Sequence, residues 1–162
     1  MSGTESQTTP PVATLPAVGD AEATAKVEGE YKFRFNGFTM AYGHLWYLVG
    51  LGHFHIDHDG KLTGQQYGSI SQIQGRNPSL QQGRYRLTGS VAMYDRDNQI
   101  KGSGSAIITF SKDSGIGLDV RGQFFLMSTG EGRLWMISTV SSDPDTHFGD
   151  DELVSGEAIR LS

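Results

Sequence analysis

The stretch Gly52-His53-Phe54-His55-Ile56-Asp57-His58-Asp59-Gly60 decides how the rest of the chain is interpreted. Successive side chains of a β-strand point to opposite faces, so the polar and apolar alternation over 52–56 predicts a strand. The pair Asp59-Gly60 is typical of a tight turn between antiparallel strands. The strand therefore ends in a hairpin, with His53 and His55 on one face and Phe54 and Ile56 on the other.

The same pattern of strands and turns continues in both directions from this hairpin. Strands are predicted at about 31–35, 45–56, 61–73, 84–94, 100–110, 116–128, 134–140 and 153–161. Most of the connections are short and contain Gly, Asp, Asn or Ser, and no segment has a 3.6-residue apolar period. Short connections make neighbouring strands antiparallel. The sequence therefore predicts an all-β fold, an antiparallel up-and-down barrel of about eight strands that leaves no sheet edge exposed.

A sandwich of two sheets is the alternative architecture, but its crossovers need longer loops than most of these. The length of 162 residues fits one domain. Residues 1–27 are rich in Ser, Thr, Pro and Ala and have few large apolar side chains. They are expected to form a disordered tail that contributes nothing to the core, and residues 28–162 to form the barrel.

Composition limits the classes of partner and the compartment. The formal net charge is −5 and the basic residues are scattered, so no basic stripe is available to bind nucleic acid. The absence of cysteine excludes disulfides and thiolate zinc sites. No apolar run approaches the roughly 20 residues of a membrane span, and residues 1–7 do not resemble a secretory signal. We expect a cytoplasmic protein with no nucleic-acid or membrane partner.

The histidines are the first candidate site. A strand places His53 and His55 about 7 Å apart on one face, a spacing that suits two imidazoles on one metal ion, with His44 or His147 as a further ligand. The glutamate that follows such a pair in cupin barrels is missing. Histidine also exchanges protons near neutral pH, so either residue could act as acid or base inside a lumen. If Ile56 is a core residue, however, both histidines point outward unless a bulge intervenes.

Aromatic residues are the second candidate site. A barrel of eight strands has room inside for side chains or for one small ligand, and ligand sites are mostly apolar with a few polar groups. Tyr47 and Tyr67 are candidate hydrogen-bond donors. The candidate ligand-binding wall consists of Trp46, Phe54, Phe35 and Trp135. The strand at 45–56 is apolar on both faces, which predicts a second cover such as a subunit contact, and hence a homo-oligomer.

Acidic clusters are interpreted as turns and loops. Residues 57–60 and 95–98 resemble calcium loops but lack the glycine and distal glutamate of the twelve-residue motif. Aspartate and asparagine are ordinary turn formers, so both are predicted to be hairpin turns. The acidic segment 143–152 is a solvated loop, or alternatively a lid at one barrel end with His147 and Phe148 dipping inward.

The motifs found along the chain also carry a resemblance to a known group of proteins. They are Val49-Gly50, Ile56-Asp57-His58-Asp59-Gly60-Lys61-Leu62-Thr63-Gly64, Gly83-Arg84-Tyr85-Arg86-Leu87, Phe125-Leu126-Met127 and Leu134-Trp135-Met136-Ile137-Ser138-Thr139. Over about residues 29–161 the chain resembles small bacterial calycin-like barrels, similar in outline to the allene oxide cyclase and lipocalin barrels. The resemblance implies a hydrophobic lumen and cofactor-free chemistry on an apolar substrate, often in an oligomer. No catalytic residue of that family matches a position here.

These observations favour a cofactor-independent enzyme of the cyclase, isomerase or lyase type. Its substrate would be a small, largely apolar aromatic or isoprenoid molecule in the lumen, with His53 and His55 as acid–base candidates and no metal or cofactor. Three alternatives stay open: a lipocalin-like binding protein without catalysis, a structural barrel with a packed lumen, and a metal-dependent enzyme through the same two histidines.

Overall fold

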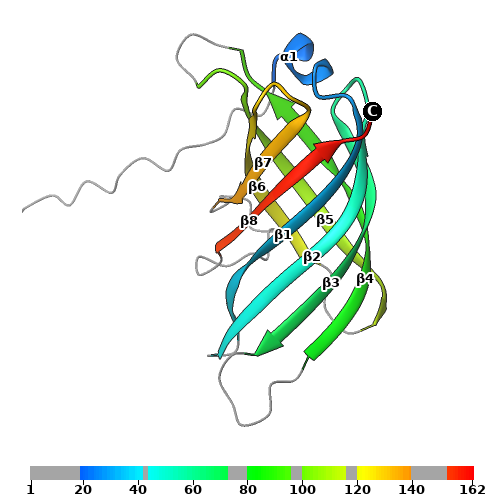
Figure 1. The fold of residues 1–162 in the computed structure, drawn as a ribbon, viewed down its shortest axis with the longest axis vertical. Helices are drawn as coiled ribbons and strands as arrows, with labels where there is room; N and C mark the ends of the chain where they lie inside the picture. The colour runs from blue at the N-terminus through cyan, green and yellow to red at the C-terminus, as the bar shows by residue number, and fades with distance from the viewer. Residues whose placement is uncertain (1–18, 42–43, 73–79, 96–99, 116–119, 140–152) are drawn as a thin grey trace, which may run out of the picture.

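A computed structural model of the chain describes residues 19–41, 44–72, 80–95, 100–115, 120–139 and 153–162. Its elements are α1 (Ala21–Ala25), β1 (Gly29–Ala41), β2 (His44–Ile56), β3 (Lys61–Gln72), β4 (Leu80–Met93), β5 (Ser103–Gly115), β6 (Val120–Ser128), β7 (Arg133–Ser138) and β8 (Leu153–Arg160). The strands pair in chain order, all antiparallel, and β8 pairs with β1 to close the barrel (Figure 1). The predicted up-and-down barrel is therefore confirmed.

The turn that joins β2 and β3 forms as its sequence predicts. Asp57 Oδ1 accepts hydrogen bonds from the backbone N–H groups of Asp59 and Lys61, at 3.1 and 2.8 Å. Gly60 has a φ of +83°, a conformation that glycine adopts without steric cost. Because the turn itself uses the Asp57 carboxylate, the structure favours a hairpin here over a calcium loop.

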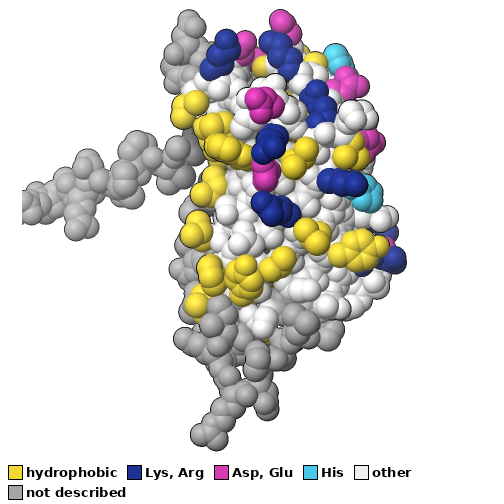
Figure 2. Space-filling view, in the orientation of Figure 1, with side chains coloured by type: hydrophobic (Ala, Val, Ile, Leu, Met, Phe, Trp, Pro, Cys, Tyr) yellow, Lys and Arg dark blue, Asp and Glu magenta, His cyan; other side chains and the backbone are white. Residues whose placement is uncertain are grey.

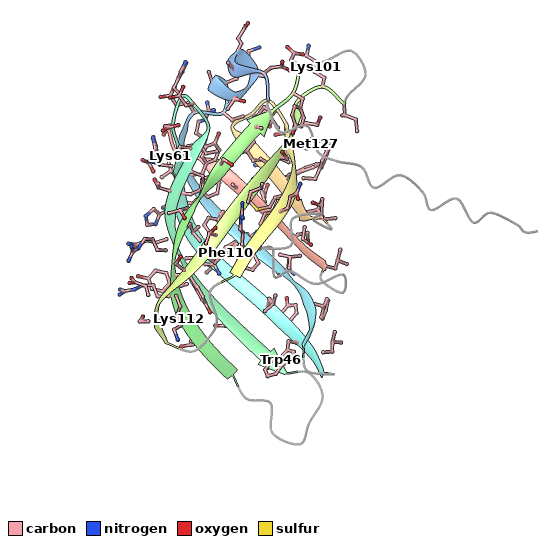
Figure 3. All side chains as sticks on the ribbon, turned by 180° about the vertical axis from the view of Figure 1, so that it is seen from behind. Trp46, Lys61, Lys101, Phe110, Lys112 and Met127 are labelled. Carbon is pink, nitrogen blue, oxygen red and sulfur yellow. The ribbon has the colours of Figure 1, made fainter. Side chains whose placement is uncertain are left out.

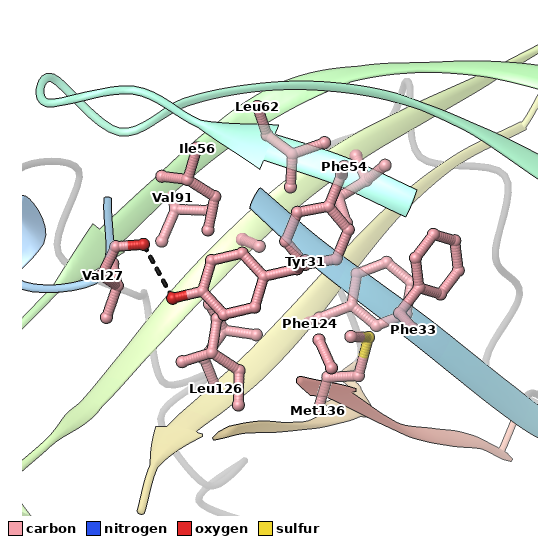
Figure 4. Close-up of a cluster of buried hydrophobic side chains, with 14 of the residues drawn as sticks. Val27, Tyr31, Phe33, Phe54, Ile56, Leu62, Val91, Phe124, Leu126 and Met136 are labelled. Carbon is pink, nitrogen blue, oxygen red and sulfur yellow. Dashed lines mark hydrogen bonds between the residues drawn. The ribbon is translucent and has the colours of Figure 1, made fainter. Parts of the chain in front are cut away.

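The barrel interior near α1 is packed with aromatic and aliphatic side chains (Figure 4). The ring of Tyr31 stacks on that of Phe54 with 5.2 Å between the ring centres, and the centre of the Phe33 ring lies 5.4 Å from that of Phe54. The Tyr31 hydroxyl donates a hydrogen bond to the Val27 carbonyl at 2.9 Å, so its polar end is satisfied although the residue is buried. This half of the barrel is a filled core.

Glycines on β2 make room for the rings of β1. Gly50 and Gly52 pair with Phe35 and Phe33, and both positions face the interior. A Cβ atom on Gly52 would lie 2.6 Å from the Phe33 ring, and one on Gly50 would lie 2.2 Å from the Phe35 ring. Each ring therefore lies across a glycine of the neighbouring strand, an arrangement that recurs in strongly curved sheets.

Residues 19–27 form part of the folded unit, whereas the sequence predicted that they belong to a tail without contact to the core. The side chain of Thr24 is buried and accepts a hydrogen bond from the Met93 backbone N–H at 3.1 Å, and Val27 belongs to the core cluster. The Asp20 N–H donates to the Met93 carbonyl at 2.8 Å. A helix of five residues is too short to show a period, so only these tertiary contacts reveal the segment.

No helix within the described ranges is long and apolar enough to cross a bilayer. Residues 1–18 lie outside the described part of the chain, as do the predicted turn residues 96–98 and the lid candidates His147 and Phe148.

Candidate functional site

The two histidines of β2 lie on the outer wall of the barrel. His53 is exposed and pairs across the sheet with Lys32, while His55 pairs with Glu30. The Nδ1 atom of His55 is 3.1 Å from Glu30 Oε1, within ion-pair distance but without the alignment of a hydrogen bond, and the side chain is 43% exposed. The pairing of β2 with β1 and β3 runs without a bulge through these residues. Both side chains therefore point away from the lumen.

Three of the predicted aromatic residues also lie outside. The side chains of Tyr67 and Trp135 are exposed. The Tyr47 hydroxyl accepts a hydrogen bond from Asn36 Nδ2 at 3.3 Å, and its ring lies 5.2 Å from that of Phe38. All of these residues occupy outward positions of the strand alternation, so none of them lines the interior.

Phe54, Phe35 and Trp46 occupy inward positions at three levels of the barrel. Phe54 is part of the filled core near α1 and is buried. Phe35 is half-buried and packs against that core, with its ring 6.5 Å from Phe110. Trp46 is half-buried at the end of the barrel away from α1 (Figure 3). The predicted residues thus do not form a single site, but two of them share the half of the lumen farther from α1.

Within the described ranges, no group of three or more His, Asp or Glu side chains could hold a metal ion. His147 lies outside these ranges, and so does the side chain of His44. The metal-dependent alternative therefore gains no ligand set from the part of the chain that is described.

The buried interior is electrically neutral wherever the structure describes it. No Asp, Glu, His, Lys or Arg of the described residues is buried, and the buried polar side chains are Thr24, Gln66, Ser103 and Ser105. Ser105 shares a hydrogen bond of 2.8 Å with the Tyr94 hydroxyl. Lys112, which pairs with the inward-facing Tyr85, is exposed. A site in this interior can recognise a molecule by shape, by apolar contact and by a few neutral hydrogen-bonding groups.

Gln66 is the side chain that stands out in this interior, and the sequence analysis missed it. It is only 5% exposed, it lies on β3 between Gly52 and Tyr85 of the neighbouring strands, and its Oε1 atom is buried with no hydrogen-bond partner. Buried polar atoms in proteins nearly always have a partner, so an orphaned amide oxygen inside a barrel needs an explanation. The alternation from Leu62 along the strand would have placed Gln66 inward.

The lumen around and beyond Gln66 differs from the filled core. A Cβ atom on Gly68, the next inward position of β3, would be 3.1 Å from Gln66 Nε2, and its next neighbours would be 3.7 and 3.8 Å away. Further inward positions toward this end belong to Phe35, Leu48 and Tyr85, which are half-buried instead of buried. Solvent-sized molecules therefore reach inward side chains in this half of the barrel, which we call the far lumen.

Comparisons of the chain with models of protein families, with curated proteins and with solved structures find no match. The resemblance to calycin-like barrels is therefore supported by the closed antiparallel architecture alone, and membership of the allene oxide cyclase or lipocalin families stays a prediction.

Proposed function

We propose that this protein binds a small, largely apolar molecule in the far lumen and holds it through one hydrogen bond to Gln66. The observation that carries the proposal is the buried, unpartnered Oε1 atom of this residue. A buried acceptor without a partner costs about 1–3 kcal/mol, and a donor group on a ligand would remove that cost. An amide can also turn its NH2 group toward an acceptor, so the ligand needs a single neutral polar group, such as a hydroxyl.

The walls of the far lumen set the rest of the ligand's chemistry. Phe35, Leu48, Trp46 and Tyr85 supply apolar and aromatic surface, and Gly68 adds no side chain beside the Gln66 amide. The filled core closes the lumen toward α1. Because a barrel of eight strands holds at most one small ligand, the molecule is of the size of a substituted aromatic ring system or a short isoprenoid.

Binding without catalysis accounts for this site better than cyclase, isomerase or lyase chemistry. Such reactions need a group that moves a proton. Within the described residues the buried interior holds no Asp, Glu, His, Lys or Arg, and the hydroxyl of the buried Tyr31 already donates to the Val27 carbonyl. The side chains of His53, His55, Tyr47 and Tyr67 lie on the outer wall, so they could act as acids, bases or hydrogen-bond donors only on a molecule bound there. A lumen of mostly apolar side chains with a few polar groups is what a carrier or sensor of a small molecule requires.

A matched pair of probes tests the proposal. 2-Naphthol and naphthalene have the same ring system, but only the first has a hydroxyl that can donate to Gln66. Binding to the full chain is measured by calorimetry for the wild type, for Gln66→Met and for the control Gln65→Met, whose side chain points outward. We expect Gln66→Met to weaken 2-naphthol binding roughly 2-fold to 12-fold, the equivalent of one net hydrogen bond, and to leave naphthalene binding no weaker.

A second variant locates the probe. Gly68→Leu places a side chain beside the Gln66 amide, and since this glycine has no unusual φ, the backbone accepts the change. We expect this variant to lose binding of both probes while its melting transition stays cooperative. The proposal fails if the wild type binds neither probe, or if Gln66→Met binds both with unchanged affinity.

A further inference from the structure

The outer wall of the barrel is divided into a polar half and an apolar half. Exposed outward positions of β3 and β4 are polar apart from Tyr67; examples are Thr63, Gln65, Arg84, Arg86, Thr88 and Ser90. Exposed outward positions of β7, β8, β1 and β2 include large apolar side chains, namely Trp135, Ile137, Leu153, Phe38, Val49 and Leu51. We call this second region the apolar face. In Figure 2 its apolar side chains surround a central group of charged ones.

The strand register shows how the apolar face is arranged: the neighbouring residues Arg34 and Glu157 lie between Leu51 on one side and Trp135 on the other. Phe38 on β1 pairs with Leu153 on β8, and Arg34 pairs with Leu51 on β2 and with Glu157 on β8. Adjacent strands are about 4.8 Å apart and residues along a strand about 3.3 Å, so the face measures roughly 20 Å in each direction. Its outline of roughly 400 Å² lies within the range of the largest apolar patches on monomers, about 300–600 Å², which are often functional, and is about half of the roughly 800 Å² that each side of a standard interface buries.

The charges at the centre of the face are paired within the chain. Glu157 lies 3.2 Å from Arg133 and 3.7 Å from Arg34, and its side chain is only 22% exposed. Interfaces are enriched in aromatic residues and arginine and depleted of lysine and acidic residues at their centre. Trp135, Phe38, Arg34 and Arg133 fit that composition. The acidic group among them, Glu157, is already paired with the two arginines.

The apolar face also carries a projection and a hollow side by side. The Trp135 side chain is 54% exposed. Next to it lies a surface hollow of about 700 Å³, whose lining includes Asn36, Val49, Leu51 and Ser155 as well as Trp135 itself. When two copies meet across a two-fold axis, the same patch serves both sides, so a projection on each must find a hollow on the other. This face has both a projection and a hollow, so a second copy supplies the shape that each needs.

We propose that the apolar face is the contact between two copies of this chain, with Trp135 of each copy seated in the hollow of the other. This assignment does not rest on the lumen site, because Trp135, Leu51 and Val49 are exposed on the outer wall whereas Gln66 is buried inside. The polar half of the wall then remains in water, as expected for a sheet with one covered face.

Sedimentation equilibrium of the full chain tests the proposal. We expect the wild type to be a dimer at tens of micromolar, and Leu51→Glu and Ile137→Glu each to weaken dimerisation at least about 10-fold, because each places an unpaired charge in the contact. Thr88→Glu adds the same charge to the polar half and is expected to leave the dimer unchanged. Far-ultraviolet circular dichroism and the melting transition check that all three variants stay folded.

Thiol labelling gives a second test of the contact. A single introduced cysteine reports its own accessibility, because the natural chain has no cysteine. The variant Val49→Cys is expected to react with a maleimide more slowly as the protein concentration rises, and the control Ser90→Cys to react at a constant rate. A monomeric wild type, a dimer that Leu51→Glu leaves intact, or a ring of more than two copies would overturn the proposal. So would a monomer that uses this face to bind lipid vesicles or a different protein.

Discussion

Replacing Gln66 by methionine is expected to make the protein more stable. Most substitutions of buried residues reduce stability, so the sign of this effect is a sharp test of how the structure places the amide. Methionine has a similar length and no strong hydrogen-bonding group. The change removes an amide oxygen that has no partner and is shielded from water, and it adds apolar surface to the interior.

The size of the effect follows from the same contacts. Removing an unsatisfied buried acceptor raises the free energy of unfolding by about 1–3 kcal/mol. Imperfect packing of the new thioether lowers this gain. We expect the free energy of unfolding to rise by about 1–2 kcal/mol. For a domain of this size that corresponds to a rise in the melting temperature of roughly 3–6 °C.

Equilibrium unfolding in urea, followed by tryptophan fluorescence, measures this change for each variant. The neighbouring substitution Gln65→Met, on the outer wall, serves as the matched control and is expected to change the free energy of unfolding by less than about 0.5 kcal/mol. If Gln66→Met lowers the free energy of unfolding by about 1 kcal/mol or more, the amide must be hydrogen-bonded in the folded protein. The case for an unpaired lumen acceptor would then be lost.

Three further substitutions and one control substitution test the packing of the barrel, each by the same unfolding measurement. Phe54→Ala should lower the free energy of unfolding by about 3–5 kcal/mol, because it empties the centre of the aromatic core; a loss below about 2 kcal/mol would mean that this core is loosely packed. Tyr31→Phe should lower it by about 1–2 kcal/mol, since the Val27 carbonyl loses its donor. Gly52→Ala should lower it by about 1–3 kcal/mol, because its Cβ would lie 2.2 Å from a backbone oxygen. Gly68→Ala, with a flexible amide as its nearest neighbour, should change it little, and equal losses at the two glycines would contradict this picture.

The barrel could be predicted from the sequence because its determinants are local. Alternation over 52–56 and turn residues such as Asp57 and Gly60 specify a strand and a hairpin without knowledge of any distant contact. The same alternation, anchored on Ile56, already placed His53 and His55 outside. The position of a histidine on the sheet therefore says more about its role than its chemical versatility does.

The candidate site could not be predicted in the same way. Gln65 and Gln66 are neighbours with the same chemistry. Alternation from Leu62 assigns Gln66 to the interior, but only the closed barrel shows that its amide oxygen is buried without a partner. The apolar face depends on pairing between strands that are still farther apart in the sequence. Trp135 and Leu51 are far apart in the sequence and approach each other only because β8 returns to pair with β1.

The return of β8 to β1 also determines how the molecule reaches its final shape. Arg160 on β8 donates a hydrogen bond to the Lys26 carbonyl at 2.6 Å, and the N–H of Leu161 donates to the Glu30 carbonyl at 2.7 Å. A polypeptide leaving the ribosome cannot make these bonds until its eighth strand has emerged. Until then two strand edges stay open to pairing with other chains, so this protein passes through an aggregation-prone stage late in its synthesis.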